Sequence, residues 1–156
     1  PQFALTVQPG TRVRSGRGAH SCALSDGPVV CWGSNTSGQL GRGIVSESAL
    51  PDLVVTAIGF DDLALGYGHT CGLSAGAVFC WGLNASGQLG DGTTALTAMV
   101  HPVPNLSGVQ AIAAGTLHTC AFRSESDIRC WGGNDFGQLG DGTTVGKLQP
   151  VSIQLP

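Results

Sequence analysis

The sequence predicts an all-β protein built from β-propeller blades. A stretch that begins Cys-Trp-Gly and ends Gly-Gln-Leu-Gly occurs at residues 31–41, 80–90 and 130–140, so the copies are 49 and 50 residues apart. Short apolar runs bounded by Gly, Asn, Asp and Pro fill each copy and are typical of strands. About four strands in about 50 residues is the pattern of a propeller blade. We therefore expect three four-stranded antiparallel blades that form a partial ring, or a ring completed by association.

The predicted elements follow the same order in every copy. An apolar strand leads to a glycine and a histidine, then come a short cysteine-containing hairpin, the Gly-Gln-Leu-Gly turn, a variable loop and a last strand that begins near a proline. The first strands lie within 13–22, 63–71 and 111–120, and the last strands at 51–55, 102–106 and 150–153. The repeats run approximately over 8–57, 58–106 and 107–156 of one propeller segment, 1–156, with residues 1–7 as an extra strand.

The composition excludes several classes of protein. Charged residues make up 11% of the chain, the net charge is −3 and there are 25 glycines. Few charges and many apolar residues argue against disorder, and no Lys/Arg cluster is present that would neutralise nucleic-acid phosphates. No apolar run approaches the roughly 20 residues of a membrane span. Because the chain begins with Pro1, we expect a processed form or a piece of a longer protein.

The six cysteines fall in pairs that hairpin geometry places opposite each other. An Asp26-Gly27 turn puts Cys22 opposite Cys31, and an Ala75-Gly76 turn puts Cys71 opposite Cys80. In the third copy one extra loop residue, within 124–126, preserves the pairing of Cys120 with Cys130. Each cysteine pair then occupies a non-hydrogen-bonded position, where the Cα atoms are close enough for a disulfide.

Three cross-strand disulfides are therefore predicted, one in each blade. Buried free thiols are the alternative. A zinc site is disfavoured because the pairs lie in separate hairpins and no Cys-x-x-Cys spacing occurs. Disulfides form in oxidising compartments, so the sequence indicates a secreted, extracellular protein.

Two further residue types recur once in each repeat. Side chains alternate along a strand, so Trp32, Trp81 and Trp131 point away from the neighbouring cysteines and are expected to pack between blades, with ligand stacking as the alternative. His20, His69 and His118 are expected to form one structural hydrogen bond each, within their own blades. A metal site is the alternative, but no carboxylate recurs beside them.

The polar residues of the Gly-Gln-Leu-Gly region are also expected to be structural. Asp91 and Asp141 are interpreted as turn residues, since the further ligands of a calcium loop are missing. Asn35, Asn84 and Asn105 begin glycosylation triplets, but Asn35 and Asn84 occupy an asparagine position that the repeat itself requires. No catalytic or metal residue and no cofactor is predicted.

The repeat unit Gly-x-x-His-Thr-Cys-Ala-Leu … Cys-Trp-Gly-x-Asn-x-x-Gly-Gln-Leu-Gly-Asp-Gly-Thr-Thr … Pro-Val resembles the regulator of chromosome condensation repeat, in the cysteine-containing form of exported bacterial members. The resemblance covers nearly the whole chain. It implies a β-propeller, usually of seven four-stranded blades, of which this chain holds about three. Family members include exchange factors for a small GTPase, a plant ultraviolet-B photoreceptor and bacterial β-lactamase inhibitor proteins, and a shared fold transfers none of these functions.

The function that the sequence indicates is a secreted binding or assembly module. Its partner is expected to be a protein, a surface glycan or further copies of the chain, recognised through the least repetitive loops at 42–50, 91–101 and 141–149. The individual binding residues are unknown. A purely structural segment of a larger extracellular assembly or adhesin is the first alternative. An enzyme with its active site on the propeller face is the second, and we expect no catalysis.

Overall fold

The computed structural model describes residues 10–25 and 28–153, within which twelve strands form three four-stranded antiparallel sheets. Blade 1 contains β1 (Arg12–Ser15), β2 (His20–Leu24), β3 (Val30–Gly33) and β4 (Ser48–Leu53). Blade 2 contains β5 (Asp62–Leu65), β6 (His69–Ser74), β7 (Ala77–Gly82) and β8 (Thr97–Pro102). Blade 3 contains β9 (Ala111–Ala114), β10 (His118–Ser124), β11 (Asp127–Gly132) and β12 (Lys147–Ser152). The predicted all-β fold of three propeller blades is confirmed, while the predicted extra strand at 1–7 lies outside the described residues.

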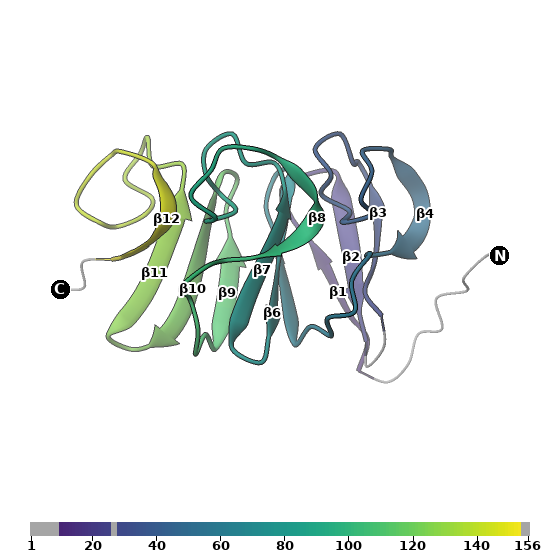
Figure 1. Ribbon diagram of the computed structural model, residues 1–156, viewed down its shortest axis with the longest axis horizontal. Coiled ribbons are helices and arrows are strands. Elements are labelled where there is room, and N and C mark those ends of the chain that lie inside the picture. The colour runs from purple at the N-terminus through teal and green to yellow at the C-terminus, as the bar shows by residue number, and fades with distance from the viewer. Residues whose placement is uncertain (1–9, 26–27, 154–156) are drawn as a thin grey trace.

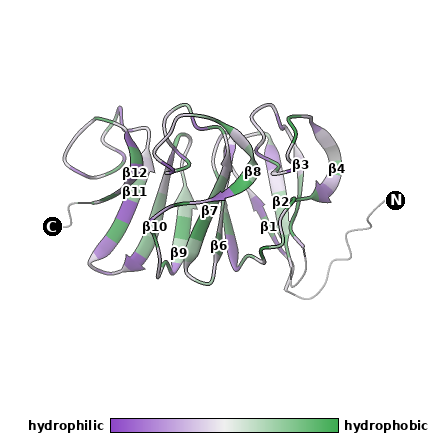
Figure 2. Ribbon diagram, in the orientation of Figure 1, coloured by the Kyte–Doolittle hydropathy of each residue, from purple (hydrophilic) through white to green (hydrophobic). Residues whose placement is uncertain are grey.

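The three blades stand side by side in chain order (Figure 1). In each sheet the strands follow one another in sequence order, and β1, β5 and β9 are the inner strands, of which β5 contacts both β1 and β9. The outer strands β4, β8 and β12 form the opposite edge of each sheet. In Figure 2 hydrophobic colour extends onto the outer strand β8.

The hairpins have the register that the cysteine spacing predicts. Cys22 pairs with Cys31, Cys71 with Cys80 and Cys120 with Cys130. All three pairs form disulfides, with Cα atoms 4.1 Å apart, and no free cysteine occurs in the described residues. The Ala75-Gly76 turn has positive φ at both residues, as a two-residue hairpin turn requires. The predicted Asp26-Gly27 turn lies outside the described residues.

The extra residue of the third hairpin lies in a strand, not in the loop as predicted. Ser124 pairs with Asp127, and the register shifts between Phe122 and Ser124, which makes Arg123 a bulged residue. A bulge absorbs one residue while it leaves the tight two-residue connection intact. The cysteine register survives by this different route.

The last strand of each blade lies earlier than predicted. The prolines were expected to begin these strands, but β4 and β8 end at Leu53 and Pro102, and β12 ends at Ser152. The proline is tolerated inside or at the end of these strands because an outer strand has one unpaired edge, where a missing N–H costs nothing. The outer strands therefore take up the second half of each loop that was predicted to be variable.

The hydrophobic core lies in the seams between neighbouring blades. One buried cluster joins the disulfide of blade 1, Leu24 and Leu40 to Phe60 and Trp81 of blade 2. A second cluster joins the disulfide of blade 2 and Leu89 to Ala121 and Trp131 of blade 3. The face of each sheet that carries the disulfide thus meets the face of the next sheet that carries the tryptophan. A single blade buries little by itself, as in other repeat proteins.

Candidate functional site

The Gly-Gln-Leu-Gly turn of each of the first two blades accepts the hydrogen bonds that cross the seam from the next blade. The backbone carbonyl of Gln39 accepts a 2.9 Å hydrogen bond from the indole Nε1 of Trp81, and Gln88 accepts the same bond from Trp131. Gly41, with φ of 68°, lies directly against the Trp81 ring, and a Cβ there would come within 2.8 Å of Nε1. Trp81 and Trp131 are fully buried. The recurring tryptophans of blades 2 and 3 are therefore seam residues.

The histidines of blades 1 and 2 bond to the next blade, which corrects the expectation of a bond within their own blades. His20 Nε2 lies 2.9 Å from Thr70 Oγ1, and His69 Nε2 lies 3.0 Å from Thr119 Oγ1. Each of these hydroxyls also donates to the glutamine carbonyl of the preceding blade, at 2.9 Å. His20 and Thr70 lie one repeat apart, and each blade has a hydroxyl residue beside its own histidine. The sequence alone therefore does not show whether a histidine bonds within its own blade or to the next one.

The threonine bonds fix the tautomer of the buried histidines. The hydroxyl hydrogen of Thr70 goes to the carbonyl of Gln39, so His20 Nε2 must donate to the hydroxyl oxygen. His20 Nδ1 is then a bare acceptor, and it has no hydrogen-bond partner within the described residues; the same holds for His69. Burial lowers the pKa of His20 to about 4, and burial, followed by the charges of His20 and His118, lowers the pKa of His69 to about 3. These side chains are neutral structural donors.

The threonine and glutamine of the seam were missed in the sequence reasoning. Thr70 and Thr119 follow the recurring histidines, and Ser21 keeps a hydroxyl at the same place in blade 1. The recurrence of a hydroxyl at this position was the signal that the sequence offered. Its role became visible only in the fold, where the hydroxyl of Thr70 or Thr119 reaches the glutamine carbonyl of the preceding repeat.

The two remaining seam residues lie at the ends of the row of blades. Trp32 is partly exposed on blade 1, and His118 is partly exposed on blade 3. Neither forms a seam hydrogen bond to a described residue. Burial lowers the pKa of His118 as well.

A buried asparagine in each blade holds the loop that follows the Gly-Gln-Leu-Gly turn. Asn84 Oδ1 accepts from the backbone N–H of Leu89 at 3.0 Å, and its Nδ2 donates to the carbonyls of Thr93 and Ala95 at 3.1 Å each. Asn35 and Asn134 make the equivalent bonds and are likewise fully buried. The glycosylation triplets at Asn35 and Asn84 are thus closed to modification in the folded chain, whereas Asn105 is exposed.

Aspartates close the same loops in blades 2 and 3. Asp91 and Asp141 each accept from the backbone N–H and the hydroxyl of the threonine two residues later, at 2.8–2.9 Å. The Thr143 hydroxyl, together with Lys147, lowers the pKa of Asp141 to about 2. These carboxylates serve as turn residues. In the described residues no group of three or more His, Cys, Asp or Glu side chains is placed to hold a metal ion.

The loops held in this way, together with the outer strands β4, β8 and β12 that follow them, display most of the exposed large apolar side chains of the described residues. We call this set the loop surface: Ile44, Val45, Leu50, Leu96, Met99, Val145 and Leu148, which are 40–65% exposed. The loops that join β3 to β4, β7 to β8 and β11 to β12 all lie along one edge of the molecule, at the top of Figure 1. Exposed apolar side chains on these loops and strands are a candidate interaction surface.

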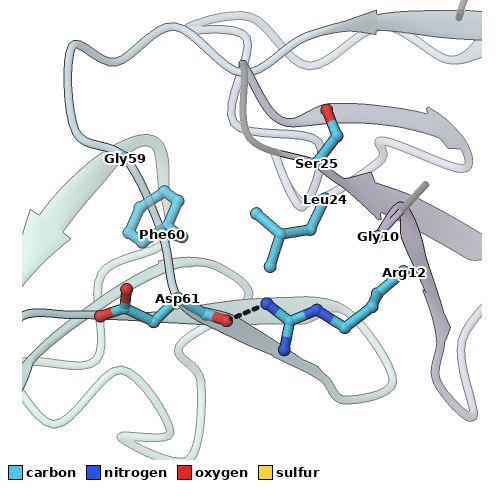
Figure 3. Close-up of a pocket in the computed structure, with 7 residues that line it drawn as sticks. All are labelled: Gly10, Arg12, Leu24, Ser25, Gly59, Phe60 and Asp61. Carbon is cyan, nitrogen blue, oxygen red and sulfur yellow. Dashed lines mark hydrogen bonds between the residues drawn. The ribbon is translucent and has the colours of Figure 1, made fainter. Parts of the chain in front are cut away.

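A pocket of about 440 Å³ lies between blades 1 and 2, where the start of β1 and the end of β2 face the residues that precede β5 (Figure 3). Arg12 and Asp61 line it, together with Leu24 and Phe60. Arg12 Nη2 donates to the Asp61 carbonyl at 2.5 Å, and the Asp61 carboxylate accepts from the backbone N–H of Ala75. Both charged groups are engaged within the chain, so the loop surface is the better candidate site. In the described part of the chain no helix has the length and apolar character needed to cross a membrane.

Two protein-family models match this arrangement of repeats. The model of the regulator of chromosome condensation (RCC1) repeat matches residues 26–73 and 75–122, which is more than half of the chain. The chain belongs to the RCC1 repeat family. A second RCC1 repeat model matches residues 60–88 and 109–138. A search of the curated proteins found no match.

Solved structures show the same RCC1-type fold. Prp20p from Saccharomyces cerevisiae, in a study of its binding to Gsp1p and histones, superposes with a TM-score of 0.81 at 23% identity, over 92% of this chain and 38% of that one. Yeast RCC1 (Prp20) bound to Kap60 gives 0.78 at 21%, over 92% and 37%. Human WBSCR16 gives 0.76 at 25%, over 88% and 37%. This chain therefore spans less than two fifths of each of these relatives.

Proposed function

We propose that this chain is a protein-binding module whose partner docks on the loop surface. One observation carries the proposal: large apolar side chains are exposed on the loops that buried asparagines hold and on the outer strands that follow these loops. A rigid surface loses little conformational entropy on binding. The RCC1-type relative Prp20 is described with protein partners, namely Gsp1p, histones and Kap60. This supports a protein as the class of ligand and does not identify the ligand of this chain.

The chemistry of the loop surface favours a protein over a glycan. Its members are aliphatic side chains and one methionine, which bury apolar area when a partner docks. Sugars present hydroxyl groups that need polar side chains as partners. The asparagines of these loops are already bonded to the loop carbonyls.

We also propose that the module works in an oxidising compartment outside the cytosol. Three disulfides and the absence of a free cysteine in the described residues support this placement. The check is thiol trapping of the protein in its native host, followed by mass analysis. A chain whose six cysteines all alkylate before reduction would contradict the proposal.

The binding function is tested by affinity capture with matched variants. The immobilised chain is exposed to the extracellular protein fraction of its host, and captured proteins are quantified by mass spectrometry. We expect a partner that is retained by the parent chain and lost with the double variant Ile44→Ser/Val45→Ser. The control Val13→Ser removes a similarly exposed apolar residue from β1, 59% exposed against 53% and 58%. Equal capture by the parent and the double variant would contradict a role for the loop surface.

A structural segment of a larger assembly is the second candidate, and the open seam residues Trp32 and His118 favour it. The two candidates differ in where partners attach: a structural segment uses its end blades and leaves the loop surface free. Neither proposal includes a catalytic step. Hydrolase assays on generic ester, peptide and glycoside substrates provide the check on that point.

A further inference from the structure

A second pocket, of about 190 Å³, lies between blade 3 and the connection that leads into it from blade 2. We call it the arginine pocket. Its polar lining residues are Asn105, Arg123, Arg129 and Gln149, and its apolar walls are Pro104, Leu106 and Pro150. Side chains alternate along a strand, so Arg129 shares the face of β11 that carries the buried Trp131. The pocket therefore belongs to the side of blade 3 that faces blade 2.

The two arginines are departures from the repeat. Strand pairing aligns Arg129 with Phe79 of blade 2 and Val30 of blade 1, which are apolar. Arg123 is the bulged residue, and the hairpin of blade 2 has no equivalent of it. Phe79 packs against the core between blades 1 and 2 and contacts Phe60 edge to face. The blade therefore forms with an apolar side chain at this position and does not require an arginine.

Hydrogen bonds fix both guanidinium groups beside the pocket. Arg123 donates from Nε to the Ser107 carbonyl at 2.7 Å and from Nη1 to Asp127 Oδ2 at 2.5 Å. Arg129 donates from Nε to Asp127 Oδ1 at 2.6 Å. A β-bulge re-aims a side chain, and here it brings Arg123 to the same carboxylate as Arg129. Groups that are already ordered lose little conformational entropy when a ligand binds.

The cluster retains free donors and a positive charge. A guanidinium has five N–H donors, and no described residue accepts from Nη1 or Nη2 of Arg129 or from Nη2 of Arg123. The hydrogen bond from Arg129, followed by the charges of both arginines, lowers the pKa of Asp127, so this carboxylate is ionised at neutral pH. One of the two arginine charges is left uncompensated. Glu125, in the turn between β10 and β11, does not line the pocket.

We propose that the arginine pocket binds a carboxylate group, supplied by a glutamate side chain of a peptide segment. The free edge of a guanidinium matches the two oxygens of a carboxylate. One carboxylate balances the one uncompensated positive charge, whereas a dianion exceeds it. The proline and leucine walls cover the methylene groups of the side chain. The arginines do not belong to the loop surface, so this site does not depend on binding at that surface.

The first test is a titration followed by NMR of the arginine Nε–H signals. The probe is the peptide acetyl-Ala-Glu-Ala-amide, whose single carboxylate is the glutamate side chain, and acetyl-Ala-Gln-Ala-amide is its uncharged match. We expect the signals of Arg123 and Arg129 to shift with a dissociation constant of about 1–10 mM, as for a small ligand. The glutamine peptide should bind about ten-fold more weakly. No saturable shift, or equal binding of the two peptides, overturns the proposal.

Two further probes identify the anion and its source. Acetate offers a carboxylate without a long aliphatic chain, so it should bind more weakly than the glutamate peptide, by about four-fold for each methylene group that the walls cover. Equal affinity for acetate and the peptide overturns the peptide as the source of the carboxylate. Sulfate that binds more tightly than the peptide overturns the choice of a carboxylate.

Matched variants test the role of Arg129. Arg129→Phe introduces the side chain that blade 2 has at this position, so the chain should fold, and the shift of the Arg123 signal should be lost. Arg129→Lys retains the charge without the guanidinium fork and should weaken binding by about ten-fold. The control Arg42→Gln removes one positive charge from the salt bridge with Asp52 in blade 1 and should bind like the parent chain.

The outcomes of these variants separate the pocket from other causes. Circular dichroism and the count of protected cysteines confirm that each variant is folded. Undiminished binding by Arg129→Phe, or an equal loss in Arg42→Gln, overturns the pocket as the site. Ile44→Ser/Val45→Ser should bind the glutamate peptide like the parent chain, so failure of the loop surface and failure of the arginine pocket are distinguishable.

Discussion

At the scale of single residues, the repeat motif is a set of seam and loop contacts. Gln39 uses its side chain to close its own turn, by accepting from the N–H of Ser37, and its backbone carbonyl to hold the next blade. His69 is a neutral donor because its Nδ1 would gain an unpartnered proton on ionisation. The recurring histidines of blades 1 and 2, which the sequence offered as candidate metal ligands, thus have a structural role. Their titration predicts how stability depends on pH.

Acid should destabilise the chain through its buried histidines. The pKa is lowered to about 4 for His20 and about 3 for His69, from an ordinary value of 6.5. Between these values and 6.5 the unfolded chain binds protons that the folded chain does not, so the free energy of unfolding falls as the pH drops below 6.5. The slope reaches about 1.4 kcal/mol per pH unit for each histidine.

Urea unfolding at pH 7.5 and pH 5.0 measures this loss. His69→Gln should lower the stability at pH 7.5 and reduce the difference between the two pH values. His101→Gln, which removes an exposed histidine on β8, is the matched control and should retain the slope of the parent chain. A free energy of unfolding that is unchanged between the two pH values would contradict the assignment of neutral buried histidines.

The asparagine of each loop should carry much of its rigidity. Asn134→Ala leaves the buried N–H of Leu139 and the carbonyls of Thr143 and Val145 without their partner. We expect a cost of about 1–3 kcal/mol and faster hydrogen exchange at residues 139–147. Asp135→Ala, at the exposed neighbouring position, is the control and should change neither quantity. Equal exchange in both variants would show that the loop is held by other contacts.

At the scale of elements, the cysteine hairpin is the unit that the sequence specifies best. The Ala75-Gly76 turn and alternation along the strands together place Cys71 opposite Cys80, and the structure has that register. The disulfides of blades 1 and 2 lie on the faces that meet the tryptophan of the next blade, so each of them packs in a seam as well as closing a loop.

Removal of a disulfide should therefore cost more in the seam between blades 2 and 3 than in blade 3. Cys71→Ala/Cys80→Ala removes a cross-link worth about 2–3 kcal/mol and also leaves a cavity under Trp131. Cys120→Ala/Cys130→Ala removes the same kind of cross-link where no tryptophan of the described residues covers it. Urea midpoints of the two double variants give the comparison. The inference of seam packing would fail if both variants lost the same stability.

Local patterns predicted the hairpins, while contacts between repeats escaped prediction. The turn residues and the paired cysteines lie within about ten residues of one another, so the sequence alone predicts the hairpin. The bond from His69 to Thr119 joins positions 50 residues apart, and an equivalent threonine lies beside the histidine in its own blade. The early position of β12 escaped because a proline is tolerated in an outer strand. The loop surface was expected from its irregular sequence, but its apolar exposure required coordinates.

At the scale of the whole molecule, stability is a property of seams and not of blades. Both buried clusters span two blades, and the hydrogen bonds of His20, Thr70 and Trp81 all cross a single seam. The surface salt bridge between Arg14 and Asp62 also crosses it, but both side chains are about one third exposed and add little. In a linear array of this kind, each change acts on the seam in which it lies.

A comparison of Trp81 with Trp32 measures how much a seam contributes. Both tryptophans follow a disulfide cysteine and precede a glycine with φ of 102–104°, so their local settings match. Trp81→Ala empties a fully buried site and removes the bond to Gln39, at an expected cost of about 3–5 kcal/mol. Trp32→Ala, with no described blade against it, should cost at most half as much in the same urea unfolding measurement. Equal losses of stability would contradict this expectation and would mean that the tryptophan stabilises its own sheet and not the seam.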